Sequence, residues 1–170
     1  MADPGPARKS AFAPVVAPDA RVLVLGSLPG EASLAAARYY AHPRNQFWKL
    51  AGAVIGRDDL HLLEYEQRLS VLTGAGIGLW DTITSAHRTG SLDAAIREAE
   101  HAPLADLVAT LPDLRAIAFN GATSARIGRR QLADHRGMTL VDLPSSSPAH
   151  AAMSFAAKRE KWLQVAHFLD

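Results

Sequence analysis

Residues 39–48 bring together side chains that can bind and process a flat polar ligand. The segment contains four aromatic residues, and a histidine, an arginine and an asparagine surround its single proline. Aromatic rings stack on flat ligands, an asparagine amide both donates and accepts hydrogen bonds, and histidine and arginine bind anionic groups. This mixture is costly to bury and has no evident purpose on a plain surface. We therefore expect a ligand site that includes this segment.

The place of the segment in the chain indicates where that site lies. An apolar run at residues 22–25 leads into a turn bounded by Gly26 and Gly30, and residues 39–48 follow it. Glycines at both ends allow the backbone of such a turn to approach a ligand closely. Open α/β sheets bind their ligands beyond the carboxyl ends of the strands. The order of strand, turn and polar segment therefore predicts a site at that edge of a sheet.

Two more polar segments come directly after apolar runs. Asn120 follows the run at residues 116–119, and residues 145–150 follow the run at 139–143. Because the carboxyl ends of parallel strands meet at one edge, we expect these segments to converge on the same site.

The elements that must position these segments alternate between strands and helices. Four short apolar runs predict buried strands at 22–25, 77–83, 116–119 and 139–143. Helical patterns predict helices at 45–55, 62–72, 91–100, 103–111, 122–132 and 154–169. This alternation predicts an α/β fold: a three-layer α/β/α sandwich around a mainly parallel four-stranded sheet.

Length and composition predict one domain with a mobile lead-in. The chain has 170 residues, of which 48% are hydrophobic, which is enough for a full core. Residues 1–20 mix four prolines with small residues and contain no long apolar stretch. We therefore expect a mobile segment over residues 1–20, without the features of a signal peptide, and a single domain over residues 21–170.

Composition also excludes several classes of function. The chain has no cysteine, so a disulfide, a thiolate nucleophile, a cysteine-bound zinc site and an iron–sulfur cluster are all excluded. No apolar run reaches the length of a membrane-spanning helix. The formal net charge of +1 does not by itself indicate nucleic-acid binding, although basic and acidic residues gather in separate stretches of the chain. We expect a cytoplasmic protein, associated with the nucleoid.

Four motifs, in this order, resemble the uracil-DNA glycosylase superfamily, and in particular its hypoxanthine-DNA glycosylase branch. The resemblance runs from about residue 21 to the C-terminus. The motifs are Gly26-Ser27-Leu28-Pro29-Gly30, then Tyr40-Ala41-His42-Pro43-Arg44-Asn45-Gln46-Phe47-Trp48, then Phe119-Asn120-Gly121, then Leu143-Pro144-Ser145-Ser146-Ser147-Pro148-Ala149.

The resemblance implies how the base is held and cut. It makes Gly26, Ser27, Leu28 and Pro29 the first wall of a pocket for an extruded base, in a place where many members carry a polar, water-activating residue that this chain lacks. It supplies the missing group as Asn45, whose amide would orient the attacking water or donate to the departing base. Asn45 also precedes an apolar helical pattern, so the alternative is a helix N-cap.

The resemblance also implies which groups recognise the base. Asn120 would read the edge of the base, since an amide pairs with a carbonyl beside a ring N–H, as hypoxanthine and uracil both present. The alternative is an asparagine that serves only the strand-to-helix turn. Tyr40 would stack on the base, whereas Phe47 and Trp48 are expected in the core at the start of a helix.

The DNA contacts are implied by two segments. The resemblance makes residues 145–150 a loop that grips phosphates and fills the gap left by the extruded base; its candidate residues are Ser145, Ser146, Ser147, Pro148 and His150. Related sequences often end this motif with asparagine where this chain has His150, so the role of that position stays open. His42 and Arg44 are further candidates, His42 as a donor to a phosphate or to the leaving base, with a capping histidine as its alternative.

One carboxylate stands inside an apolar run. Asp81 lies within residues 77–83, where an unpaired carboxylate is costly. It could orient a water or a loop, or have a purely structural role. Arg88 could be its partner or could contact a phosphate.

These observations predict a DNA glycosylase that acts on deaminated bases, chiefly hypoxanthine and also uracil or xanthine. Its partner would be DNA, and we expect a monomer with no cofactor, metal or obligate protein partner. No lysine lies in the motifs, and Lys49, which follows the second motif, is placed in a predicted helix, so hydrolysis without strand cleavage is expected. The alternatives are a protein that binds damaged or abasic DNA without cleaving it, and a hydrolase of free nucleosides.

Overall fold

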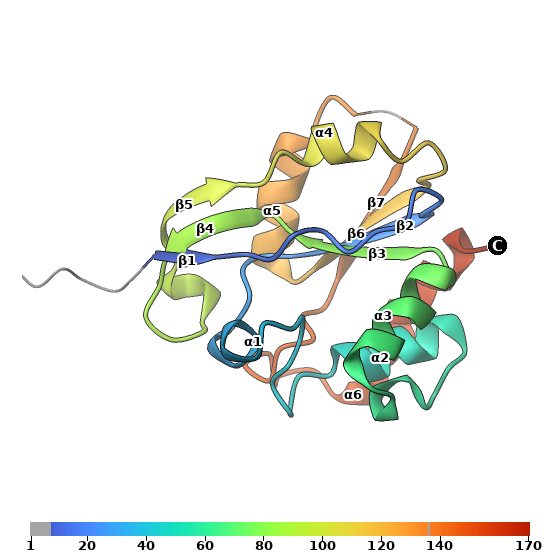
Figure 1. The fold of residues 1–170 in the computed structure, drawn as a ribbon, viewed down its shortest axis with the longest axis horizontal. Helices are drawn as coiled ribbons and strands as arrows, with labels where there is room; N and C mark the ends of the chain where they lie inside the picture. Colours follow the sequence, from blue (N-terminus) through green and yellow to red (C-terminus); the bar gives the residue numbers. More distant parts are fainter. Residues whose placement is uncertain (1–7, 136) are drawn as a thin grey trace, which may run out of the picture.

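A parallel four-stranded sheet forms the centre of the molecule (Figure 1). The computed structural model describes residues 8–135 and 137–170. Within this part the central strands are β2 (Val22–Gly26), β3 (Ile77–Asp81), β6 (Ala116–Asn120) and β7 (Thr139–Leu143), in the order β3-β2-β6-β7. All three pairings are parallel. The strands predicted at 22–25, 116–119 and 139–143 are therefore confirmed, as is a strand in the first part of the run at 77–83, and the carboxyl ends of all four meet at one edge.

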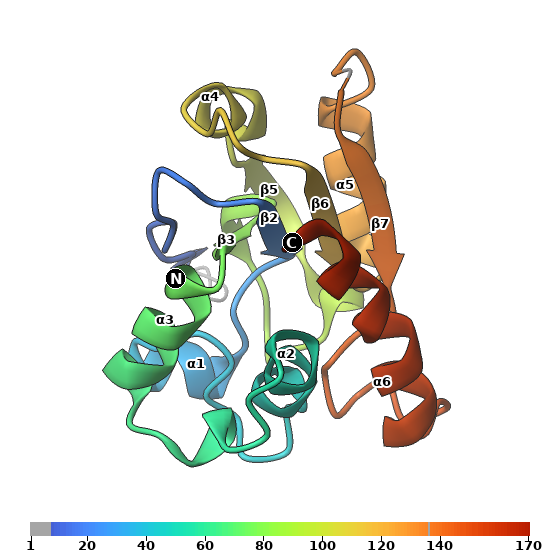
Figure 2. The ribbon, with the colours of Figure 1, turned by 90° about the vertical axis from the view of Figure 1, so that its right-hand side faces the viewer.

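Helices cover both faces of this sheet (Figure 2). One face packs against α2 (Phe47–Ile55), α3 (Tyr65–Gly74) and α6 (Phe155–Trp162). The other face packs against α4 (Leu104–Ala109) and α5 (Ala122–Gln131). The short helix α1 (Glu31–Ala36) follows β2, and the 3₁₀ turns span Leu60–Leu62, Asp93–Ala95 and Leu163–Phe168. The three-layer α/β/α prediction is confirmed.

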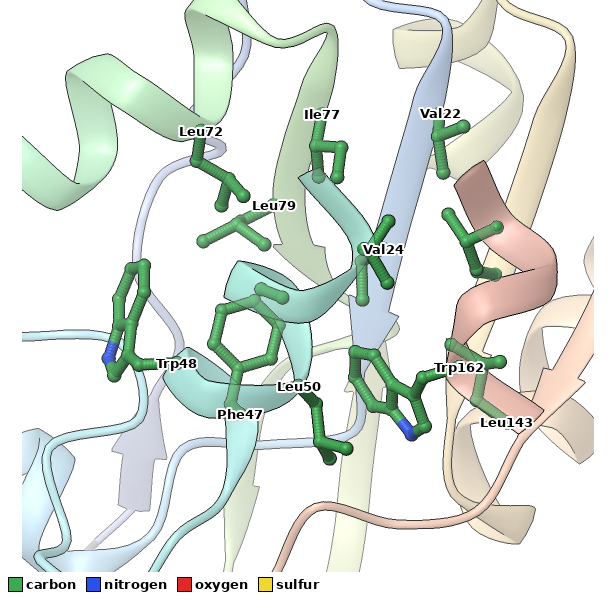
Figure 3. Close-up of a cluster of buried hydrophobic side chains, with 14 of the residues drawn as sticks. Val22, Val24, Phe47, Trp48, Leu50, Leu72, Ile77, Leu79, Leu143 and Trp162 are labelled. Carbon is green, nitrogen blue, oxygen red and sulfur yellow. The ribbon is translucent and has the colours of Figure 1, made fainter. Parts of the chain in front are cut away.

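The core follows the alternation of side chains along the strands. Val22 and Val24 point to the face covered by α2 and α6, whereas Leu23 and Leu25 point to the face covered by α4 and α5. Figure 3 shows the first cluster, in which Trp48 and, from α6, Trp162 lie on either side of Phe47. The resulting burial of apolar surface is the main stabilising contribution to this fold.

A second sheet, which the sequence does not predict, lies beside the first. It has three antiparallel strands, β1 (Arg8–Ser10), β4 (Ile83–His87) and β5 (Arg97–His101), in the order β1-β4-β5. The apolar run predicted as one strand at 77–83 therefore divides between β3 and β4.

The prediction of a helix at residues 91–100 is wrong. Residues 97–101 form β5, which pairs with β4 through register shifts, and Glu98 takes a left-handed φ of 52°. Arg, Glu and Ala favour a helix by propensity, but Ile96 and Ala99 pack against the small apolar cluster around Ile83. Tertiary pairing outweighs local propensity here.

Residues 8–20 belong to the folded structure, which differs from the mobile segment expected over residues 1–20. Arg8–Ser10 pair with β4, and Val15 forms a bridge with Leu79 of β3. Tyr39 Oη and Trp80 Nε1 donate hydrogen bonds to the carbonyls of Ala13 and Phe12. Residues 1–7, the rest of the expected segment, lie outside the described residues.

None of the helices formed by the described residues has the length and apolar character needed to cross a bilayer.

Ser154 caps α6, and this cap yields a stability prediction. Its Oγ accepts a hydrogen bond of 3.2 Å from the backbone N–H of Ala157. We expect Ser154→Ala to lower the free energy of unfolding by about 1 kcal/mol, measured by urea denaturation. The matched control is Ser70→Ala at an exposed position inside α3, which is expected to be neutral or slightly stabilising because alanine favours a helix. Equal losses in the two variants would contradict a capping role.

Candidate functional site

A cavity of about 300 Å³ lies at the carboxyl ends of the central strands. Gly26 ends β2, Asp81 ends β3 and Asn120 ends β6, and all three line it. The predicted site residues that line the cavity are Gly26, Ser27, Leu28, Pro29, Tyr40, His42, Asn45, Asn120, Ser145, Ser146, Ser147, Pro148 and His150. Arg44 is exposed and does not line it. The structure thus brings together the four motifs, and it leaves Arg44 on the surface beside them.

The turn after β2 forms one wall, and a buried arginine holds it in place. Arg88 is 1% exposed, and its guanidinium donates hydrogen bonds to the backbone carbonyls of Leu28, Pro29 and Gly90. The sequence leaves open whether Arg88 pairs with Asp81 or contacts a phosphate. In the structure its hydrogen bonds go to backbone carbonyls instead. Ser27 is also fixed, since its Oγ donates a 2.6 Å hydrogen bond to Asp93 Oδ1.

Gly26 makes room for polar side chains from two other elements. A Cβ at this position would stand 2.6 Å from Asp81 Oδ1 and 3.2 Å from Tyr40 Oη. The lack of a side chain at Gly26 therefore lets a carboxyl and a phenol approach the strand end together. Any larger residue would push Asp81 out of its place.

Asp81 is buried in this wall with one oxygen unpaired. The side chain is 4% exposed, and its Oδ2 has no hydrogen-bond partner among the described residues. Burial, and secondarily the Asp93 carboxylate, raises the pKa of Asp81 to about 7, while Arg88 lowers it. The carboxyl group is thus in balance between its neutral and charged forms near neutral pH.

Asn45 is tied to the start of α2. Its Oδ1 accepts a 2.9 Å hydrogen bond from the backbone N–H of Phe47, the first residue of that helix, and its own N–H donates to the carbonyl of His42. Asn45 is not the N-cap itself, which is Gln46, but from the preceding position its side chain satisfies the first N–H of the helix. The bond also fixes the amide orientation, because only the oxygen can accept from an N–H. Asn45 lines the cavity, and its Nδ2 makes no hydrogen bond with the described residues.

Asn120 and Ser146 form a reciprocal pair across two strand ends. Asn120 Nδ2 donates to Ser146 Oγ at 2.9 Å, and the Ser146 N–H donates to Asn120 Oδ1 at 2.9 Å. Both residues are buried. The amide thus anchors the loop of residues 145–150, hereafter the serine loop, in addition to its place in the strand-to-helix turn. It keeps one N–H and one lone pair for a ligand.

The serine loop is also held by Gln46, the residue before α2, and by side chains of α6. The carbonyl of Ser146 accepts from the N–H of Gln46, and Gln46 Oε1 accepts from the buried Lys158 at 3.0 Å. Trp162 Nε1 donates to the carbonyl of Pro144 at the start of the loop.

Within the loop, the serine hydroxyls cap the backbone. Ser145 Oγ and Ser147 Oγ accept from the N–H groups of Ser147 and Ala149. These hydroxyls keep their own O–H as donors toward a ligand. His150 is exposed at the end of the loop.

The aromatic residues divide between cavity and core. Tyr40 lines the cavity and stacks on Phe47 with a centroid distance of 3.9 Å and an interplanar angle of 15°. Phe47 and Trp48 are buried in the core, as the sequence predicts. Tyr40 has a left-handed φ of 54°, and burial raises its pKa, with Asp81 adding to the rise and the Asn120 amide opposing it. Its hydroxyl makes no hydrogen bond of standard geometry among the described residues.

His42 stands at the rim of the cavity in a defined tautomer. Its Nδ1 accepts a 3.1 Å hydrogen bond from the N–H of Arg44. The neutral ring therefore carries its hydrogen on Nε2, which can donate to a ligand.

Sequence reasoning missed one wall of the cavity. Ser91, Leu92 and Asp93 line it from the connection between β4 and β5, and Glu31 lines it from α1. These residues were not predicted at the site because the sequence pattern predicts a helix at 91–100. The Gly90-Ser91 pair is a turn signal that indicates a loop at this point instead. Among the described residues, no group of three or more His, Asp or Glu side chains is placed to hold a metal ion.

Comparisons with known proteins agree on one family. The family model described as the uracil DNA glycosylase superfamily matches residues 13–167. A protein named hypoxanthine DNA glycosylase from Methanosarcina barkeri is 39% identical over 117 residues, which is 69% of this chain and 73% of the relative. A protein of the same name from Methanosarcina acetivorans is 36% identical over 146 residues, which is 86% of this chain and 90% of the relative.

A solved structure has the same fold. The solution NMR structure of a candidate uracil DNA glycosylase from Methanosarcina acetivorans superposes with a TM-score of 0.84 and is 34% identical. The match covers 96% of this chain and 99% of that chain.

Proposed function

Because the chain belongs to the uracil-DNA glycosylase superfamily and is a DNA glycosylase, we propose that the base it chiefly excises is hypoxanthine, with uracil and xanthine as further substrates. The names of the two relatives support hypoxanthine as the principal base. The observation that carries the proposal is the convergence of all four motifs on one cavity at the strand ends. A volume of about 300 Å³ is sufficient for a single base extruded from the helix.

The contacts within the cavity support a division of roles. Tyr40 offers a ring for stacking, and Asn120 offers one amide N–H and one lone pair to the base edge. Asn45, with its amide fixed by α2, would place the water or donate to the base. Ser145 and Ser147 would donate to phosphates, as would His42 and His150 of the cavity lining and the exposed Arg44, which lies two residues after His42.

The reaction we propose is hydrolysis that leaves an abasic site. Cleavage of the N-glycosidic bond builds positive charge on the sugar and negative charge on the base, so donors fixed toward the base lower the barrier. A strand-cleaving glycosylase forms a Schiff base through an amine. No lysine lines the cavity within the described residues, and Lys49 is exposed on α2.

End-labelled duplexes test this proposal. Each duplex carries one deoxyinosine, deoxyuridine or deoxyxanthosine, and the reaction is analysed with and without alkali. We expect strand breaks at deoxyinosine only after alkali, which reveals an abasic site. Duplexes with deoxyguanosine at the same position are the control, and free deoxyinosine tests for a nucleoside hydrolase. Tight binding of the deoxyinosine duplex without base release would overturn the proposal, as would breaks that need no alkali.

A further inference from the structure

Asp81 is a buried carboxyl group in the cavity that none of the roles above uses. It ends β3, lines the cavity, and leaves Oδ2 without a hydrogen-bond partner among the described residues. A structural aspartate inside a protein usually has its oxygens paired, because an unpaired buried polar group is costly. Asp81 thus lines the space where a ligand would sit and carries a buried oxygen that is not satisfied by the described residues.

The surroundings of Asp81 favour its protonated form. Among the described residues, no lysine or arginine forms an ion pair with it. The nearby Arg88 directs its hydrogen bonds to backbone carbonyls. A carboxyl group that is buried without a directly bound cation is stabilised as the neutral acid, and a neutral acid carries one O–H donor.

Asp81 also lies on the side of the cavity that would hold the base. Its Oδ1 and Tyr40 Oη both approach the point where Gly26 would carry a Cβ. The Asn120 amide is close enough to Tyr40 to lower the pKa of the phenol. The acid, the ring proposed for stacking and the amide proposed for reading the base therefore gather at one strand end.

We propose that Asp81 is the general acid for excision of the purine and protonates N7 of hypoxanthine as the base departs. This inference rests on the proposed function. In the step, the bond between C1′ and N9 breaks and its electron pair moves into the base, where the proton from Asp81 is bound at N7. Water forms the new bond to C1′, and the proton it loses restores the carboxyl group directly or through solvent. The products are the neutral base and an abasic deoxyribose.

Protonation at N7 makes the choice of substrate depend on the chemistry of the base as well as on its shape. Hypoxanthine and xanthine carry N7, whereas uracil has no equivalent nitrogen. A proton delivered at this position stabilises the charge that develops on a departing purine and gives no such help to a pyrimidine. Asp81 thereby favours the purine substrates over uracil.

Single-turnover excision of deoxyinosine tests the role of Asp81. Asp81→Asn keeps the size of the side chain but has no transferable proton, and we expect a loss of at least about tenfold at pH 6 to 7. The matched control is Asp113→Asn at an exposed position, which is expected to keep the wild-type rate. For the wild type, the rate should fall as the pH rises above about 7, and this fall should be absent in Asp81→Asn. Asp93, Arg88, Tyr39 and Tyr40 also face Asp81, so the variant identifies which group is titrated.

A second substrate and a stability measurement complete the test. A duplex with 7-deazadeoxyinosine has no N7, and the wild type should excise it at least about tenfold more slowly than deoxyinosine. Burial raises the pKa of Asp81 from 3.8 to about 7, so the folded state binds this proton more tightly than the unfolded chain. The free energy of unfolding should therefore fall between about pH 4 and 7 as the pH rises, and less so in Asp81→Asn.

The outcomes separate this inference from the proposed function. A wild type that leaves deoxyinosine intact would overturn the proposed function itself. A wild type that excises deoxyinosine, together with an Asp81→Asn variant of equal rate or unchanged pH dependence, would overturn the role of Asp81 alone. Equal excision of 7-deazahypoxanthine and hypoxanthine by the wild type would do the same. If Asp81→Asn is inactive but less stable than the wild type at pH 8, where it should be more stable, the residue is structural and the inference fails.

Discussion

Replacement of Asn45 by alanine is expected to lower the single-turnover rate of deoxyinosine excision by roughly 10²- to 10³-fold, the effect of losing one fixed hydrogen-bonding group at a reacting centre. The Asn45 amide lines the cavity, and its orientation is fixed by the bond from Phe47 to Oδ1. In the turn from Gly26 to Gly30 the only polar side chain is Ser27, whose hydroxyl is already bonded to Asp93. The measurement is quenched-flow excision with enzyme in excess over the duplex.

The same change removes a capping contact, so a control must separate the two effects. Asn45→Ser keeps a side-chain oxygen that can accept from the start of α2, but it lacks the amide. We expect Asn45→Ser to recover the stability that Asn45→Ala loses, while its excision rate stays low. Near wild-type excision by Asn45→Ser would show that Asn45 serves the helix alone. The water-placing role would then have to move to another residue.

The second large effect concerns stability and comes from Gly128 in α5. An ideal Cβ at this position would stand 2.2 Å from Cε1 of Phe119, whose ring is fully buried between β6 and the helix. Alanine normally stabilises a helix relative to glycine by up to about 1 kcal/mol. Here the sign is expected to reverse, and Gly128→Ala should lower the free energy of unfolding by about 2 kcal/mol because the helix must move away from the sheet.

Gly74→Ala is the matched control for Gly128. Gly74 is the last residue of α3, and nothing lies within 4 Å of an ideal Cβ there. We expect this variant to leave the free energy of unfolding unchanged or to raise it by up to about 1 kcal/mol in urea denaturation. A Gly128→Ala variant that is as stable as Gly74→Ala would mean that Phe119 can shift at little cost. Because Phe119 directly precedes Asn120, excision of deoxyinosine by Gly128→Ala would show whether such a shift reaches the cavity.

The central fold could be predicted because its signals are local. Each buried parallel strand is a short apolar run bounded by turn residues, and the glycine-bounded turn at Gly26 to Gly30 marks where the first strand ends. The second sheet could not be predicted in this way. β5 reads Arg-Glu-Ala-Glu-His, a sequence with no strand alternation, and it is a strand only because β4 offers a partner.

The motifs predict which residues form the candidate site, but they do not predict the hydrogen bonds between those residues. The sequence places Asn120 and Ser146 at neighbouring strand ends, but their reciprocal hydrogen bonds depend on the register of β6 and β7. The sequence does not predict the wall formed by residues 91–93, because these residues fall in the segment that it predicts as a helix. Asp81 was identified as unusual from its apolar neighbours, whereas its unpaired oxygen could be found only from the packing around Gly26.

The bonds that hold the serine loop bear on what DNA binding costs. The loop is fastened to Asn120 at one side and, through Gln46 and Lys158, to α6 at the other. Side chains and backbone that are already fixed in the unbound protein lose little conformational entropy when a ligand arrives. If this loop contacts the phosphates as we propose, the protein would bind DNA with a preorganised surface. Most of the conformational entropy lost on forming the complex would then be lost by the extruded nucleotide.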